Sequence, residues 1–153
     1  MGNADPNALC VAVAAAQAVH QIGMPEARII LSQAVTYVAS APKSNAAYLA
    51  VDKALEAVKN VDHSGGNQAF DIPVHLKDAH YKGAAKLGHG LGYQYAHDFP
   101  NHYVNQQYLP YELNGKEFYR PSGNGYEVKI KEHMRKIRRE AGQPERRADR
   151  PES

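Results

Sequence analysis

The chain has 153 residues, with 18 basic and 16 acidic side chains, a formal net charge of +2 and a single cysteine. This length fits one domain or two small ones, and it suffices to bury a core without cross-links. The balanced charge excludes a strong overall field for nucleic acid or membrane surfaces. One cysteine excludes an intramolecular disulfide framework and a cysteine-based zinc site, and no apolar run is long enough to cross a bilayer. We therefore expect a cytoplasmic protein without a membrane partner.

Composition divides the chain into unlike segments. Residues 1–60 are rich in alanine and carry as many basic as acidic side chains, whereas residues 61–126 hold eight of the ten tyrosines and most of the histidines and glycines. Lys and Arg then dominate residues 127–140, before a polar, proline-containing tail. We predict a three-helix bundle core over 1–60, a Gly/Tyr/His-rich irregular segment packed on it over 61–126, a basic amphipathic helix over 127–140 and a disordered tail over 141–153.

Capping and breaking residues place the first two helices. Asp5 followed by Pro6 supplies an N-cap acceptor and a fixed φ, and Gly23 is suited to closing the helix that starts there. Pro25 opens a second helix in the same way, and Pro42 prevents its continuation. The first helix is apolar nearly all round and should be buried on several sides. Cys10 lies inside it and is expected to be a small core residue.

A third helix follows Ser44, which is suited to capping it. Apolar side chains recur at three- and four-residue steps and predict its buried face, which comprises Tyr48, Val51, Leu55 and Val58. The links between the three helices are short, which favours antiparallel neighbours. The expected fold is therefore all-α, an antiparallel helical bundle with an ordered irregular segment and a C-terminal helix.

The density of Gly and Pro in residues 61–126 prevents long helices or strands. Short helices are expected near 75–79 and 83–87, joined by ordered loops. The glycines at 88, 90 and 92 spell G-x-G-x-G, which does not match the dinucleotide-binding fingerprint. Base stacking on the tyrosines would need interleaved Lys or Arg, yet this segment has five basic and six acidic groups. Tyrosines packed on the bundle or in a subunit contact are favoured instead.

Histidines in this segment permit one alternative function. His89, His97 and His102 could supply metal ligands, which would make the chain a small metal-dependent enzyme. No pair has the spacing that places two ligands on one helical face, and hydrogen bonding by histidines explains the same composition. We therefore favour no metal, and we keep the metal-dependent enzyme as the alternative.

The last helix is basic and amphipathic. Its apolar stripe comprises Tyr126, Ile130, His133 or Met134, and Ile137. The rest of the helix carries six cations that are candidate contacts to a phosphate backbone, namely Lys129, Lys131, Arg135, Lys136, Arg138 and Arg139. A docked helix with a solvated outer face is the more common origin of this pattern.

Several motifs, in order, resemble a known family over about residues 2–139. They comprise Ala4-Asp5-Pro6, the runs 22–35 and 41–50, His75–Tyr81, Lys86–Gly90, Gly92–Tyr95, His97–Pro100 and Gln106–Pro110. This series resembles the C-terminal part of the replication-associated recombination protein A family, also called MgsA. These are AAA+ ATPases related to the Werner-helicase-interacting protein.

The resemblance implies a clamp-loader collar-like domain that assembles the protein into a homotetramer. It implies a parent protein that is a DNA-dependent ATPase at stalled replication forks, acting in replication, recombination and repair. ATP and Mg²⁺ would bind in a parent module outside this chain, and single-stranded-DNA-binding protein would be a partner. We expect this chain to be a non-catalytic C-terminal piece with no cofactor or catalytic residue of its own, in a cytoplasmic, nucleoid-associated protein.

Overall fold

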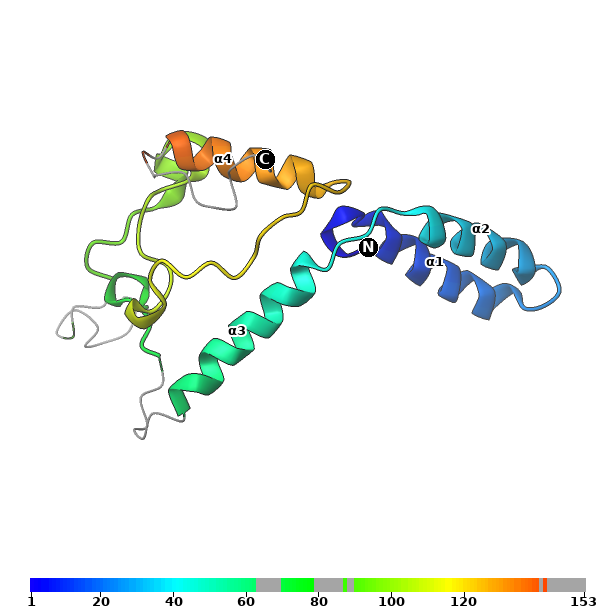
Figure 1. Cartoon of the computed structure of the whole chain (residues 1–153), viewed down its shortest axis with the longest axis horizontal. Helices are drawn as coiled ribbons and strands as arrows, with labels where there is room; N and C mark the ends of the chain where they lie inside the picture. The colour runs from blue at the N-terminus through cyan, green and yellow to red at the C-terminus, as the bar shows by residue number, and fades with distance from the viewer. Residues whose placement is uncertain (63–69, 79–86, 88–89, 141, 143–153) are drawn as a thin grey trace. The chain divides into compact units, whose positions relative to one another are not determined.

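Four α-helices account for the regular structure in the computed structural model, which describes residues 1–62, 70–78, 87, 90–140 and 142. They are α1 (Asn7–Ile22), α2 (Ala27–Ser40), α3 (Ala46–Asp62) and α4 (Glu127–Glu140), seen in Figure 1. The described residues contain no strand, so the predicted all-α class is confirmed. Within the described ranges, no helix is both long and apolar enough to span a membrane. The tail predicted over 141–153 lies outside them, apart from Gly142.

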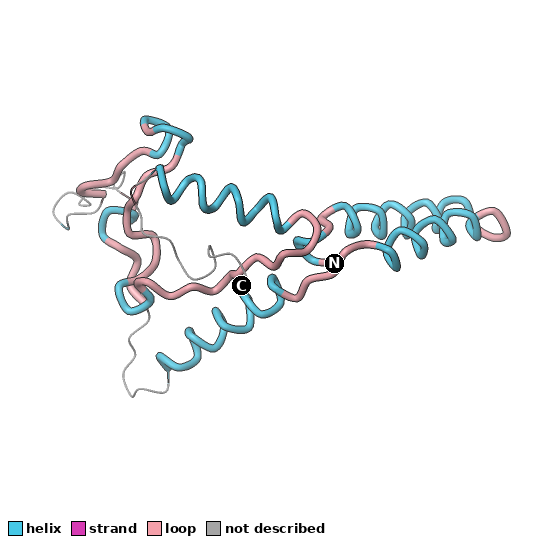
Figure 2. The backbone as a smooth tube through the Cα atoms, turned by 45° about the horizontal axis from the view of Figure 1, so that its top comes forward, coloured by secondary structure: helices cyan, strands magenta, loops and turns pink. Residues whose placement is uncertain are grey.

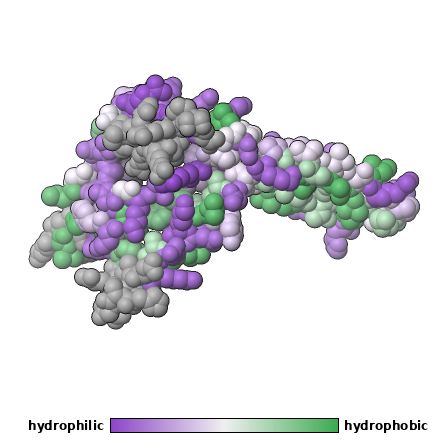
Figure 3. Space-filling model, in the orientation of Figure 1, coloured by the Kyte–Doolittle hydropathy of each residue, from purple (hydrophilic) through white to green (hydrophobic). Residues whose placement is uncertain are grey.

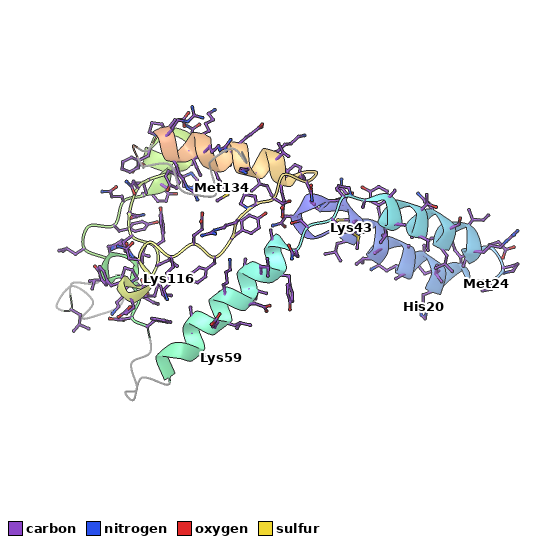
Figure 4. The ribbon with its side chains drawn as sticks, in the orientation of Figure 1. His20, Met24, Lys43, Lys59, Lys116 and Met134 are labelled. Carbon is purple, nitrogen blue, oxygen red and sulfur yellow. The ribbon has the colours of Figure 1, made fainter. Side chains whose placement is uncertain are left out.

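The helices α1 and α2 form an antiparallel hairpin, and they lie side by side in both ribbon views (Figures 1 and 2). The side chain of Asp5 accepts a hydrogen bond from the Asn7 N–H at 3.0 Å, as expected of a residue before a helix. Gly23 ends α1 with a φ of 76°, and its N–H donates to the Val19 carbonyl. The predicted start and end of this helix are thus confirmed. Met24 lies in the exposed turn that follows, as labelled in Figure 4.

The third helix also begins at its predicted cap. The Ala46 N–H donates to Ser44 Oγ at 3.1 Å, and α2 has ended at Ser40, two residues before Pro42. The predicted buried face of α3 is wrong, however. Tyr48, Val51, Leu55 and Val58 are each between 51% and 65% exposed, whereas the buried side chains are Ala46 and Ala57. The small residues are on the covered side because they allow closer approach of the backbone than the larger apolar side chains do.

Short 3-10 turns and side-chain hydrogen bonds order the middle of the chain. The turns are η2 (Val74–Leu76), η4 (Ala96–Asp98), η5 (Pro100–His102) and η6 (Tyr111–Leu113). His75 Nε2 donates to the Gln107 carbonyl at 2.7 Å, and the Gln106 amide donates to the Gln94 carbonyl at 3.1 Å. The helix expected near 75–79 is therefore only the turn η2. The one expected near 83–87 lies outside the described residues, apart from Leu87.

The chain divides into two compact units. The first contains residues 1–51 and 119–133, and the second contains residues 52–118 and 134–153. Each combines stretches that are distant in the sequence, whereas the predicted domains follow composition along the chain. The division at residues 60, 126 and 140 stays a prediction about domains.

A buried carboxylate, that of Glu127, organises the first unit. Glu127 is 0% exposed, and its Oε2 accepts hydrogen bonds from Ser44 Oγ at 2.8 Å and from the Ser122 N–H at 2.6 Å. Its Oε1 accepts from the Tyr119 hydroxyl at 3.1 Å, and that hydroxyl accepts from Asn3 Nδ2 at 3.0 Å. One side chain thus joins the N-terminal turn, the cap of α3 and the approach to α4.

These hydrogen bonds set the ionisation of the site. Burial raises the pKa of Glu127, but the hydrogen bonds from Ser122, Ser44 and Tyr119 outweigh it and hold this pKa below its ordinary value of 4.5. Burial raises the pKa of Tyr119; the hydrogen bond from Asn3 opposes this, and the Glu127 carboxylate reinforces it. Near neutral pH, Glu127 is therefore an anion with three donors and Tyr119 is a neutral donor.

The backbone closes tightly beside this carboxylate. The Tyr126 N–H donates to the Ala4 carbonyl at 2.8 Å. Gly125 has a φ of +53°, and a Cβ there would lie 2.2 Å from the Ala4 oxygen and 2.7 Å from Pro42 Cγ. Only glycine fits this position without displacing one of the two segments.

Gly125→Ala is expected to lower the free energy of unfolding by about 2 kcal/mol or more, because it adds both a left-handed alanine and a steric clash. Gly123→Ala is the matched control, since a Cβ at Gly123 meets no heavy atom within 4 Å. Its stability should be unchanged or raised by up to about 1 kcal/mol. Urea unfolding compares the two variants, and equal effects would contradict the proposed close approach.

Glu127→Gln should destabilise the chain at pH 7 by about 1.5–3 kcal/mol, because a charged acceptor of three hydrogen bonds is lost. A lowered folded-state pKa means that the stabilisation by Glu127 is complete above pH 4.5 and is lost as the pH falls through the folded-state value. The difference between the wild type and the variant should therefore shrink from pH 7 to pH 3.

Urea unfolding at several pH values measures this difference, with the exposed Glu132→Gln as the control of equal charge change. A gap of the same size at pH 3 and pH 7 would rule out an ionised Glu127 as the source of the stability.

Candidate functional site

The α1–α2 hairpin leaves large apolar side chains uncovered. Leu9 and Val13 on α1 are 71% and 48% exposed, and Ile29 and Val35 on α2 are 67% and 66% exposed. We call these four residues the hairpin surface, and Figure 3 shows apolar side chains gathered along this part of the chain. Interaction sites are typically built from exposed apolar side chains that lie together, so the hairpin surface is the candidate interaction site.

Alanine explains why the larger side chains face outward. Ala8, Ala15 and Ala27 are the buried residues of α1 and α2, so small side chains make the contact between the two helices. A hollow of about 290 Å³ lies on the hairpin, lined by Val11, Ala14, Ala15, Ala18, Ile30, Gln33 and Ala34. A single copy of the chain therefore does not bury α1 on several sides. Cys10 is exposed as well, which corrects its expected place in the core.

The six basic side chains predicted on the last helix all lie on α4, where they divide by exposure. Lys129, Lys136 and Arg139 are exposed, whereas Lys131, Arg135 and Arg138 are half-buried. The Lys129 ammonium lies 5.8 Å from the centroid of the Tyr126 ring. Of the predicted apolar stripe, Ile130, Met134 and Ile137 are half-buried and Tyr126 is exposed. The exposed cations are the ones available to a phosphate backbone.

Two of the three histidines considered as metal ligands are neighbours. The rings of His97 and His102 have centroids 4.9 Å apart with planes tilted by 52°, and the Tyr95 ring lies 5.0 Å from that of His97. His89 lies outside the described residues. Across the described part of the chain, no group of three or more His, Cys, Asp or Glu side chains is placed to hold a metal ion. The metal site stays a prediction.

Sequence reasoning missed Glu127. Its carboxylate stands in the first turn of a helix, which is a common place for an acidic side chain, and that position carries no sign of burial. The side chains that donate to it, Ser44 and Tyr119, are 83 and 8 residues away along the chain. The available signal was the cluster of possible donors at Tyr119 and Ser122 just before an acidic residue.

A family model described as the C-terminal region of MgsA AAA+ ATPases matches residues 1–138. Curated relatives match over most of the chain. Replication-associated recombination protein A from Bacillus subtilis is 42% identical over 138 residues, which cover 90% of this chain and 31% of that protein. An AAA domain-containing protein from Mycobacterium tuberculosis is 46% identical, with 90% of this chain and 29% of that protein covered.

The similarity extends to a eukaryotic relative. ATPase WRNIP1 from Dictyostelium discoideum is 37% identical over 123 residues, which cover 78% of this chain and 13% of that protein. The chain thus spans less than a third of the length of each of these three relatives.

Proposed function

Because the chain belongs to the family of MgsA AAA+ ATPase C-terminal domains, we propose that it is the self-association module of a AAA+ protein acting in replication-associated recombination. The observation that carries this proposal is the hairpin surface, where Leu9, Ile29 and Val35 are about two-thirds exposed. We propose a second copy of the chain as the occupant, because association of two copies would cover exposed apolar side chains on both partners.

In this proposal the chain holds copies of the protein together and does not catalyse a reaction. A stable protein interface buries about 800 Å² on each partner, and the centre of such an interface is apolar. Association through the hairpin would hold several ATPase modules together, so that weak contacts of each module with DNA add through effective concentration. The assembly we propose is a homotetramer.

The remaining parts of the activity lie outside these 153 residues in this proposal. ATP and Mg²⁺ bind in the ATPase module of the parent protein, which is a DNA-dependent ATPase acting at replication forks in the nucleoid. Single-stranded-DNA-binding protein is its partner. We assign no catalytic residue to this chain. A metal-dependent enzyme using His89, His97 and His102 is the alternative, and it requires stoichiometric metal in the purified protein.

Leu9→Asp and Val35→Asp should each shift the chain from tetramer towards monomer in sedimentation velocity, because association would bury an unpaired carboxylate. Weakening of at least about 100-fold corresponds to the several kcal/mol that such burial costs. Gln21→Asp adds the same charge at an exposed position elsewhere on α1 and is the control. If all three variants associate like the wild type, the hairpin surface is not the interface.

A second role, direct contact with DNA by α4, is favoured by the exposure of Lys129, Lys136 and Arg139. Net positive charge gathers in residues 127–153, which carry nine basic and six acidic side chains. Phosphate contacts by these side chains release counterions, and binding then weakens steeply as salt rises.

The double variant Lys136→Glu with Arg139→Glu should weaken binding to a labelled DNA duplex, and it should reduce the slope of log affinity against log salt by roughly 2. Lys53→Glu with Lys59→Glu makes the same change of charge at exposed positions on α3. Fluorescence anisotropy across a salt series measures both. Equal losses in the two double variants would assign the effect to net charge alone and would refute a contact by α4.

A further inference from the structure

We propose that the loop 94–105, together with the last turn of α4, forms a binding site for single-stranded nucleic acid. Its bases would stack on the ring ladder Tyr95–His97–His102, and its phosphates would lie against Lys136 and Arg139. All of these residues belong to the second compact unit. The proposal rests on the contact between α4 and nucleic acid proposed above, and it names the partner's class and the chemistry that selects it.

The first observation is the ring ladder itself. Successive ring centroids are 5.0 Å apart between Tyr95 and His97 and 4.9 Å apart between His97 and His102. Tyr95 is 54% exposed, and both histidines are exposed. Three adjoining exposed rings present aromatic faces on which unpaired bases can stack.

The second observation is that the backbone is held in an unfavourable conformation to build this ladder. Asn101 and His102 are consecutive non-glycine residues with φ of 55° and 53°. Both residues lie in η5, so the left-handed backbone carries the His102 ring itself, and the Asn101 amide donates a hydrogen bond to the Glu140 carboxylate. Backbone strain of this kind concentrates at binding and catalytic sites, where the surrounding structure maintains it.

The third observation is a groove beside the ladder. A hollow of about 290 Å³ is lined by loop residues that include Gln94, Phe99 and Tyr103, and by Ile137 and Glu140 from α4. The turn η5 therefore lies against the C-terminal end of α4, as Figure 1 also shows. The side-chain amide of Gln94 makes no hydrogen bond to the described residues, so its donor and acceptor are available to the edge of a base.

The basic side chains near this groove favour a ligand that carries negative charge. The sequence alone argued against base stacking, because Lys and Arg are not interleaved with the tyrosines of this segment. The fold supplies the missing cations from α4, whose residues 134–140 carry four basic side chains and one acidic side chain. That acidic side chain, Glu140, accepts the hydrogen bond from Asn101. Lys136 is exposed and stands one helical turn before Glu140 on the same face.

Base stacking on the ring ladder would also make the site prefer single-stranded nucleic acid over a duplex. The faces of bases in a duplex are covered by their neighbours, so only unpaired bases can lie on the ring ladder. Duplex DNA would still be attracted by Lys136 and Arg139. The ring ladder should therefore discriminate between the two forms, and the cations should not.

The experiment measures fluorescence anisotropy with labelled oligo-dT of about 16 nucleotides and with a duplex of equal length, across a salt series. Tyr95→Ala and His102→Ala should each weaken binding to oligo-dT by about 5- to 100-fold, from the loss of one stacked ring. Their salt slopes and their duplex affinity should stay at the wild-type values. Lys136→Gln should weaken both ligands and reduce the salt slope for oligo-dT by about 0.7.

Two controls separate stacking from folding. Tyr95→Phe keeps the ring and should bind oligo-dT like the wild type. Tyr111→Ala removes a tyrosine that is 66% exposed and lies outside the ladder, and it should also leave binding unchanged.

The proposal is overturned if the wild type does not bind oligo-dT, or if Tyr95→Ala binds it as tightly as Tyr111→Ala does. It also fails if the ring variants lose oligo-dT and duplex equally. A loss in Lys136→Gln alone would leave the contact by α4 in place and refute the stacking site.

Discussion

The buried carboxylate of Glu127 is the interaction on which the first compact unit depends. Its two oxygens accept hydrogen bonds from Ser44, Tyr119 and Ser122, and Ser44 is far in the chain from the segment that holds the other two. An ionised group is stable in a buried place only when such donors satisfy it. The N-terminal turn, the cap of α3 and the start of α4 therefore have to be assembled together, and Gly125 is the residue that lets the backbone come close enough.

Besides the buried Glu127 carboxylate, the first unit has a core of small side chains. Apart from Pro121, the buried apolar residues of the first unit are alanines, from Ala4 to Ala46, so the helices meet through short contacts and many longer apolar side chains are exposed. A polar network and close backbone contacts fix the geometry of the unit, and apolar surface remains available for a partner. In the proposed tetramer, burial of Leu9, Ile29 and Val35 would couple stability to protein concentration.

Local signals in the sequence predicted local structure well. Asp5, Gly23, Pro42 and Ser44 mark helix ends because each acts on a backbone within a few residues of itself, and all four behave as predicted. The side on which a helix is covered depends on distant segments. Apolar periodicity therefore assigned Tyr48 and Leu55 on α3 to a buried face, although alanines occupy that place.

The candidate sites also have a part that the sequence could predict and a part that depends on the fold. The basic residues of α4 could be found from their helical pattern, whereas the choice of the exposed ones required the fold. The ring ladder joins His97 to His102 across a left-handed turn at Asn101. Asparagine and histidine adopt this conformation more often than most residues, but their presence alone does not predict the turn. The loop that carries these rings lies beside α4 through a hydrogen bond between Asn101 and Glu140, which are 39 positions apart in the sequence. Composition alone therefore disfavoured base stacking, and the position of α4 beside this loop is the basis of the stacking site that we propose.

The molar mass of the wild-type chain in solution, measured by light scattering over a wide range of protein concentration, tests the central claim most directly. Self-association through an apolar surface predicts a stable mass near four times 16.8 kDa, with dissociation only on strong dilution. A mass of 16.8 kDa at every concentration would contradict the account, because the exposed apolar side chains of the hairpin would then have no second copy to cover them.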